Sequence, residues 1–279
     1  MPKAHTNGID LYYEVYGTNK ADARPEGPKL VLIEGVGYHT WMWYRQIPAF
    51  AHHFPTLIYD NRGVGESDKP PGPYSHSQNA DDLAGLLDHL GWDHAHVLGV
   101  SMGGFIAQEF ALRYPERVDK LVLVCTAFGG PNMEPIPLEA QKALTPNPNL
   151  TPEQKFRQAM PIAFADPSWP EHHAEEFERI IRWRLEQIQP AEAAVAQLMA
   201  GLTFTTEDRL GTITSPTLVI AGHADRVVPP RNAALLAEAI PGARLDIISG
   251  AGHLVFIEQA ERFNSDVIAF LTETQRESA

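Results

Sequence analysis

Residues 98–104, Leu-Gly-Val-Ser-Met-Gly-Gly, constrain what this chain can fold into more than any other segment. A short apolar run at residues 96–98 leads into this motif, and a pattern with helical spacing follows from Phe105 to Tyr114. A Gly-x-Ser-x-Gly motif between a strand and a helix predicts a sharp turn that exposes the hydroxyl of Ser101 above the sheet. The start of the helix offers free N–H groups and a dipole that favour negative charge. This combination indicates chemistry suited to acyl transfer.

Apolar runs alternate with helical patterns on both sides of this turn. The runs predict strands at residues 8–16, 29–34, 55–60, 96–98, 120–124, 216–221 and 244–248. Helical spacing predicts helices near residues 42–51, 77–90, 105–114 and 256–271. Such alternation is typical of βαβ units and predicts an α/β fold, with a mainly parallel twisted sheet and helices on both faces.

The alternation stops after Phe128 and resumes near residue 216. Between these points a proline-rich segment leads into residues 151–202, which are predicted to be helical. We therefore predict a core made of residues 1–129 and 211–279. Residues 130–210 are predicted to form a helical cap inserted into that core.

Composition limits the partners of the chain. Its 22 lysine and arginine residues face 35 aspartate and glutamate residues, which gives a formal net charge of −13. This charge argues against nucleic acid and anionic membranes as partners, and against a highly anionic substrate unless local charge at the site reverses it. No run of about 18 apolar residues is present, so no membrane-spanning helix is expected. The start of the chain lacks the apolar segment of a signal peptide, and a single cysteine allows no intramolecular disulfide, so the expected location is the cytoplasm.

A serine nucleophile needs a base to accept its proton and a third group to orient that base. Asp225 follows the predicted strand at residues 216–221, and His253 follows the next strand along the chain. Loops at the carboxyl ends of parallel strands gather at one edge of a sheet, so these two residues should meet near Ser101. His223 is an alternative base, but it lies two residues from Asp225 on the same loop, where the two side chains would rarely face each other.

Further motifs reveal a family resemblance. Residues 60–67, Asp-Asn-Arg-Gly-Val-Gly-Glu-Ser, match an Asp-x-Arg-Gly-x-Gly-x-Ser loop, and residues 114–118, Tyr-Pro-Glu-Arg-Val, lead into an apolar run. With the serine turn and the order serine, aspartate, histidine, the chain resembles the α/β-hydrolase superfamily over essentially its whole length. The Ser-Met-Gly-Gly turn and the Ala-Gln-Glu at 107–109 resemble 3-oxoadipate enol-lactonases, cofactor-free haloperoxidases or perhydrolases, and small carboxylesterases. The resemblance implies an α/β-hydrolase fold with Ser101, Asp225 and His253 as its catalytic residues.

The resemblance also implies an oxyanion hole made by two backbone N–H groups, those of Met102 and Val36. The chain departs from the family here, because Glu34 stands where the family has a histidine. A carboxylate near an oxyanion would oppose catalysis unless it points away or is paired. We expect Glu34 to hold the loop as a hydrogen-bond acceptor, and Arg62 to brace its own turn.

Together these residues predict a serine hydrolase that cleaves carboxylic esters or lactones and needs neither a cofactor nor a metal. The substrate is expected to be small and uncharged, because an apolar cap over a neutral cleft fits such molecules better than peptides or sugar phosphates. A homodimer is compatible with the sequence. The residues expected to line the pocket are Tyr38, Trp41, Phe128, Trp183 and Leu198.

Several alternatives were weighed against this interpretation. A perhydrolase or a carbon–carbon bond hydrolase would use the same three residues, and a ligand receptor would keep the fold without turnover. A dinucleotide fingerprint that begins at Gly35 fails, because Thr40 occupies the place of its third glycine. The 12 histidines include no His-Glu-x-x-His spacing, so a metal site is not expected.

Overall fold

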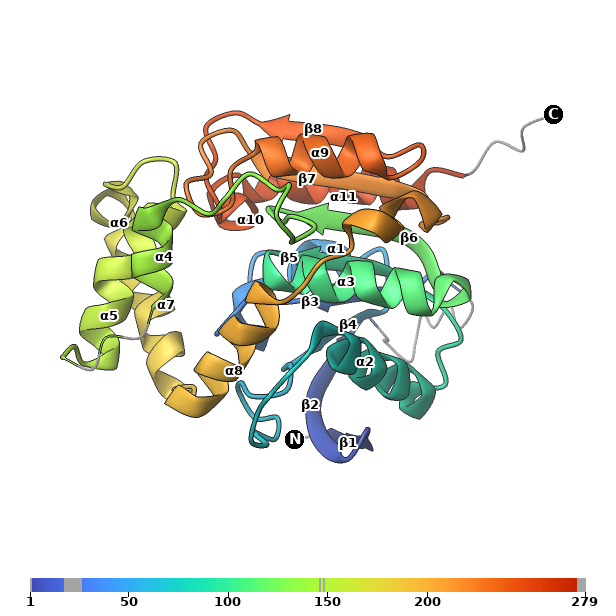
Figure 1. Cartoon of the computed structure of the whole chain (residues 1–279), viewed down its shortest axis with the longest axis horizontal. Helices are drawn as coiled ribbons and strands as arrows, with labels where there is room; N and C mark the ends of the chain where they lie inside the picture. Colours follow the sequence, from blue (N-terminus) through green and yellow to red (C-terminus); the bar gives the residue numbers. More distant parts are fainter. Residues whose placement is uncertain (1, 18–26, 146, 148, 275–279) are drawn as a thin grey trace.

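Eight strands form one sheet in the order β1-β2-β4-β3-β5-β6-β7-β8 (Figure 1). The computed structural model describes residues 2–17, 27–145, 147 and 149–274. Strand β2 pairs antiparallel with β1 and β4, and every other neighbouring pair is parallel, which confirms the prediction of a mainly parallel sheet. The strands are β1 Lys3–Thr6, β2 Ile9–Tyr16, β3 Leu30–Ile33, β4 Thr56–Tyr59, β5 Ala95–Val100, β6 Val118–Val124, β7 Thr217–Gly222 and β8 Arg244–Ile248.

Helices cover both faces of the sheet because its central strands are apolar on both faces. In β3, Leu30 and Leu32 pack into one core cluster with α1, α10 and α11, whereas Val31 and Ile33 pack into the other with α2, α3 and α9. Helices α2 and α3 lie side by side over the second face (Figure 1). These helices are α1 Ile47–Phe50, α2 His76–Leu90, α3 Met102–Arg113, α9 Arg231–Ala239, α10 Val255–Glu258 and α11 Ala260–Thr272.

The remaining helices, α4 to α8, occupy the segment predicted to be a cap. In Figure 1 the arrowheads of β6 and β8 point toward the side on which α4 to α7 lie. Phe177 and Ile180 of α7 are buried in the same cluster as Phe256, which attaches this segment to the core. That residues 130–210 form a separate domain stays a prediction. The helices are α4 Leu138–Leu144, α5 Pro152–Ala159, α6 Trp169–His172, α7 Ala174–Glu186 and α8 Ala191–Leu202.

The structure differs from the predicted elements in several places. The predicted helix at 42–51 is a 3₁₀ turn at Thr40–Trp43 followed by the four-residue α1. The predicted helix at 256–271 is broken between α10 and α11 at Gln259, whose φ of −121° and ψ of 42° are not helical. Strand β1 and helices α4 and α9 were not predicted. Further 3₁₀ turns span Pro115–Arg117, Met160–Ala163 and Glu207–Thr212. Among the described residues, no helix has the length and apolar character needed to cross a membrane.

Candidate active site

Ser101 lies at the sharp turn between β5 and α3, as the sequence predicted. Its φ of 55° and ψ of −118° are strained for a residue other than glycine. The neighbours must be small: a Cβ on Gly99 would lie 2.2 Å from the carbonyl oxygen of Gly103, and one on Gly103 would lie 2.2 Å from that of Ile33. The N–H of Ser101 donates to the carbonyl of Val124 at 2.9 Å, which ties the turn to β6. The turn therefore holds the half-buried Ser101 at the end of the strand at a cost in backbone strain.

Asp225 and His253 meet although they come from different loops. The Nδ1 of His253 lies 2.8 Å from the Oδ2 of Asp225, and both side chains are buried. The other oxygen of Asp225 accepts the N–H groups of Val227 and Val228 at 2.8 and 2.9 Å. These bonds fix the carboxylate, so it can orient the imidazole. His223 lies exposed on the same loop as Asp225, and it is His253 that contacts the carboxylate; that His253 acts as the base stays a prediction.

Cys125, the single cysteine of the chain, lies beside Asp225 and His253. It follows β6 directly with a φ of 46°, and its Sγ donates to the carbonyl of Gly252 at 3.9 Å. Its sulfur, a carboxylate oxygen of Asp225 and a ring nitrogen of His253 lie within 4.8 Å of one another. Burial, followed by the charge of Asp225, raises the pKa of the thiol well above its usual value. The thiol therefore stays protonated and apolar. The position of Cys125 directly after a predicted strand was the sequence feature that could have placed it near Asp225 and His253.

The loop that follows β6 is also bound to the turn at Ser101. Thr126 donates its hydroxyl to the carbonyl of Ser101 at 2.7 Å, and the loops after β5 and β6 are held together in this way. Among the described residues, no hydrogen bond joins Ser101 Oγ to His253. Catalytic hydrogen bonds are often long in ligand-free enzymes and tighten when substrate binds.

The loop after β3 passes against Ser101. A Cβ on Gly35 would lie 3.3 Å from the Cβ of Ser101, so glycine permits this close approach. A turn closes the loop with a hydrogen bond from the N–H of Tyr38 to the carbonyl of Gly35 at 3.3 Å, and Gly37 supplies the positive φ of 68°. Met102 is the first residue of α3, where an N–H has no acceptor within the helix. Val36 and Met102 thus belong to the two segments that flank the serine.

Comparisons with known proteins identify the family of the chain. A family model described as the alpha/beta hydrolase fold matches residues 28–260. The chain belongs to the α/β-hydrolase family. It is a hydrolase of this family, with 31% identity over 273 residues to a provisionally assigned carbamate hydrolase, RutD, of Azorhizobium caulinodans, covering 98% of this chain and 99% of the relative.

Two further relatives of this α/β hydrolase show the range of reactions in the family. It is 36% identical over 257 residues to a 2-hydroxy-6-oxononadienedioate/2-hydroxy-6-oxononatrienedioate hydrolase of Burkholderia vietnamiensis, covering 87% of this chain and 86% of the relative. Among solved structures, the enol-lactonase of Burkholderia xenovorans LB400 matches with a TM-score of 0.85 and 30% identity, covering 98% of this chain and 100% of the other.

Glu34 of this α/β hydrolase supports the loop as predicted. Its side chain is fully buried, and its Oε1 accepts the N–H of Asn61 at 2.7 Å. Burial raises the pKa of Glu34 well above its usual value, and the neighbouring charge of Asp60 raises it further. The neutral, protonated form is therefore favoured, and it places no negative charge beside the serine. Burial also raises the pKa of Asp60 to about 6.

Replacing Glu34 by glutamine should make stability less dependent on pH. Because the folded state raises the pKa of Glu34, its contribution to the free energy of unfolding is full below the unfolded pKa and is lost as pH rises through the folded pKa. Glutamine keeps the acceptor oxygen and cannot ionise. We expect the Tm of Glu34→Gln, relative to the parent chain, to increase between about pH 5 and about pH 9. A Tm difference that stays constant across this range would contradict the buried, neutral carboxyl.

Arg62 braces its loop, which confirms the structural role expected for it. Its Nε and one amino nitrogen each lie 2.6 Å from an oxygen of Asp82 on α2. Both side chains are at most 3% exposed. Asn7 donates a third hydrogen bond to Asp82 at 2.8 Å. The pair fastens the loop that follows β4 to the helix layer.

Three of the five predicted pocket residues contact one another. The rings of Trp41 and Trp183 stack with centroids 5.6 Å apart, and those of Tyr38 and Trp41 lie 5.5 Å apart. This aromatic group joins the loop after β3 to α7. Phe128 is instead buried in the core cluster beneath α3, and Leu198 is half-buried on α8.

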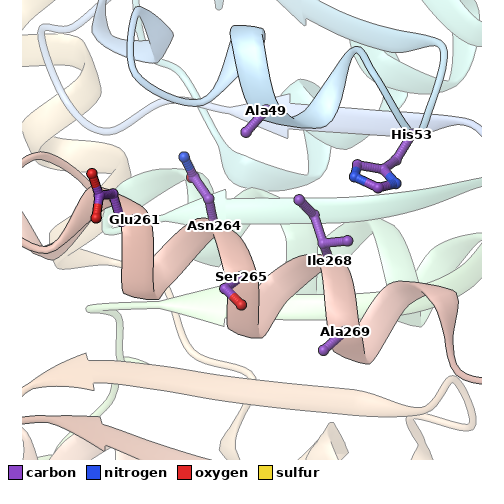
Figure 2. Close-up of a pocket in the computed structure, with 7 residues that line it drawn as sticks. All are labelled: Ala49, His53, Glu261, Asn264, Ser265, Ile268 and Ala269. Atoms are coloured by element: carbon purple, nitrogen blue, oxygen red, sulfur yellow. The ribbon is translucent and has the colours of Figure 1, made fainter.

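A hollow of about 560 Å³ lies elsewhere on this α/β hydrolase, between α1 and α11. Figure 2 shows Asn264 directed from α11 toward Ala49 of α1. Asn264 donates to the carbonyl of Arg45 at 2.9 Å and accepts from Gln46 at 3.1 Å, so it ties α11 to the two residues that precede α1. None of the predicted site residues lines this hollow. Its lining residues are Ala49, His53, Glu261, Asn264, Ser265, Ile268 and Ala269.

Proposed function

We propose that this α/β hydrolase cleaves carboxylic esters or lactones through Ser101, His253 and Asp225, with an acyl-enzyme intermediate. The observation that carries the proposal is the buried 2.8 Å contact between His253 and Asp225, at the sheet edge where Ser101 terminates β5. A histidine whose Nδ1 is held by a carboxylate has its other nitrogen available as a base. A ligand receptor would have no need of such a pair beside a strained serine.

In the proposed reaction His253 accepts the proton of Ser101 as the hydroxyl oxygen attacks the carbonyl carbon. Asp225 holds the imidazole tautomer and stabilises the imidazolium. The N–H groups of Met102 and Val36 bind the oxyanion, and loss of one such donor typically costs about 3–4 kcal/mol of the activation free energy. His253 then protonates the leaving alcohol or enol. Water hydrolyses the acyl-enzyme by the same sequence of proton transfers.

The substrate site would lie between the core and residues 130–210, which we propose act as a cap. The aromatic group of Tyr38, Trp41 and Trp183 offers an apolar wall to a small substrate. Carbon–carbon bond hydrolysis is a second candidate, favoured by the Burkholderia vietnamiensis relative, whose named substrates are oxo-dioates. It would use the same serine and histidine.

A fluorophosphonate probe and an ester panel test the proposal together. The probe should label Ser101, and labelling should abolish turnover of p-nitrophenyl esters from acetate to laurate and of a simple γ-lactone. Peptide mass spectrometry identifies the labelled residue, and enzyme blocked by the probe is the matched control. Labelling without ester or lactone turnover would favour the carbon–carbon candidate. An unreactive serine would contradict both candidates and favour a receptor.

A further inference from the structure

Arg184 of α7 is a cation without a carboxylate partner among the described residues. Two other arginines of this segment are paired, since Arg157 lies 2.6 Å from Glu178 and Arg179 lies 3.8 Å from Glu176, whereas Arg182 on the same helix is exposed to solvent. The guanidinium carbon of Arg184 instead lies 4.2 Å from the ring centroid of Tyr38 and 4.3 Å from that of Phe156. The guanidinium of Arg184 thus stacks on two aromatic rings and lacks a carboxylate partner among the described residues, although the chain carries an excess of carboxylates and a net charge of −13.

The two rings determine how Arg184 can bind a partner. The rings of Tyr38 and Phe156 stack on the guanidinium. An acceptor can therefore reach its N–H groups only in the plane of the guanidinium, at its edge. The Nε of Arg184 is buried and has no hydrogen-bond partner within the described structure. Leaving a buried donor of a charged group unsatisfied is costly. A planar anion with two oxygens matches the N–H geometry of that edge.

Arg184 lies over the loop that contacts Ser101. Tyr38 closes the turn that begins at Gly35, and a Cβ on Gly37 would lie 3.9 Å from an amino nitrogen of Arg184. Gly35 in turn approaches Ser101, so the cation and the serine lie near opposite ends of one short turn.

A second cation lies near Arg184. Lys155 is adjacent in the chain to Phe156, on whose ring Arg184 stacks, and burial together with the positive charge of Arg184 lowers the pKa of Lys155. Lys155 precedes Phe156 on α5, and it has no ion pair among the described residues. Two neighbouring cations repel each other, and a bound anion would relieve that repulsion.

We propose that Arg184 binds a carboxylate of the substrate, so that the preferred substrates are half-esters or lactones of dicarboxylic acids. This inference rests on the proposed function and replaces the expectation of an uncharged substrate. The negative charge of the whole chain does not decide the matter, because Arg184 and Lys155 place two positive charges on the segments that face this turn. Arg184 would select the substrate and position it, while Ser101 would carry the chemistry.

A matched pair of esters tests this role. Mono-p-nitrophenyl glutarate carries a carboxylate, and methyl p-nitrophenyl glutarate has the same acyl chain without the charge. The parent chain should prefer the anionic ester, and Arg184→Met should lower the ratio of kcat/KM for the two esters by about 10- to 100-fold, mainly through KM of the anionic ester. Arg182→Met, on an exposed position of the same helix, is the control and should leave the ratio unchanged.

The ratio separates recognition from structural support. If Arg184→Met lowers kcat/KM equally for both esters, or for neither, the proposal is wrong. If the parent chain hydrolyses neither ester, the proposed function fails, and calorimetric binding of glutarate to the parent chain tests the inference by itself. Binding of glutarate that is lost in Arg184→Met and kept in Arg182→Met would support the carboxylate site. An absence of binding, or binding that both variants retain, would overturn it.

Discussion

Replacing Ser101 by alanine is expected to lower kcat for ester hydrolysis by about 10⁵- to 10⁶-fold. The substitution removes the one atom that would form the acyl-enzyme, and in enzymes of this mechanism the loss of the nucleophile has an effect of this order. The fold should be retained, because alanine is no larger than serine and the close contacts of the turn involve Gly99 and Gly103. Initial rates on the best ester of the panel, with Tm as the check on folding, measure the effect.

The double variant Ser101→Ala/His253→Ala sharpens this test. Residues that act as one unit are strongly non-additive, so removing His253 from a chain that already lacks the serine hydroxyl should cost little more. If Ser101→Ala kept more than about one per cent of the parent kcat, this serine would be excluded as the nucleophile. Such a loss of kcat is far smaller than the loss expected when a nucleophile is removed. Additive losses in the double variant would mean that the two residues act independently.

Asp82→Ala is expected to lower the free energy of unfolding by about 3–5 kcal/mol, the typical cost of breaking a buried ion pair by removing one partner. The substitution leaves the guanidinium of Arg62, itself 3% exposed, without its two 2.6 Å hydrogen bonds. It also removes the nearer of two acceptors of Asn7. Urea unfolding followed by circular dichroism gives the difference, provided that the transition remains two-state.

The adjacent residue supplies a matched control. Asp81 pairs with Arg113 at 2.6 Å, but both side chains are more than a third exposed. Asp81→Ala should therefore cost only about 0.2–1 kcal/mol, because solvent screens an exposed pair. The double variant Arg62→Met/Asp82→Leu should recover most of the loss by replacing the buried pair with apolar packing. Equal losses for Asp81→Ala and Asp82→Ala would show that the buried pair does not brace the loop.

Helices and strands could be predicted wherever the apolar residues of a single segment showed the spacing of that element. The buried runs of β3 and β7 and the leucine spacing of α2, which ends at Gly91 in the left-handed conformation, needed no tertiary information. Strand β1 was missed because four residues alternating between exposed and buried give little signal. Helix α4 was missed because it is short and follows several prolines, and its one fully buried residue, Ala140, reveals its face only after packing.

The sequence by itself determined where the three residues proposed as catalytic in this α/β hydrolase stand relative to its strands. The glycine-flanked Ser101 and the placement of Asp225 and His253 after strands follow from local backbone rules, because a parallel sheet brings such strand ends to one edge. The tertiary structure decided which groups touch: His253 and not His223 meets Asp225, Glu34 bonds Asn61, and Arg184 stacks on rings with its edge unpaired. These outcomes depend on distances between segments far apart in the chain, which no local pattern of residues encodes.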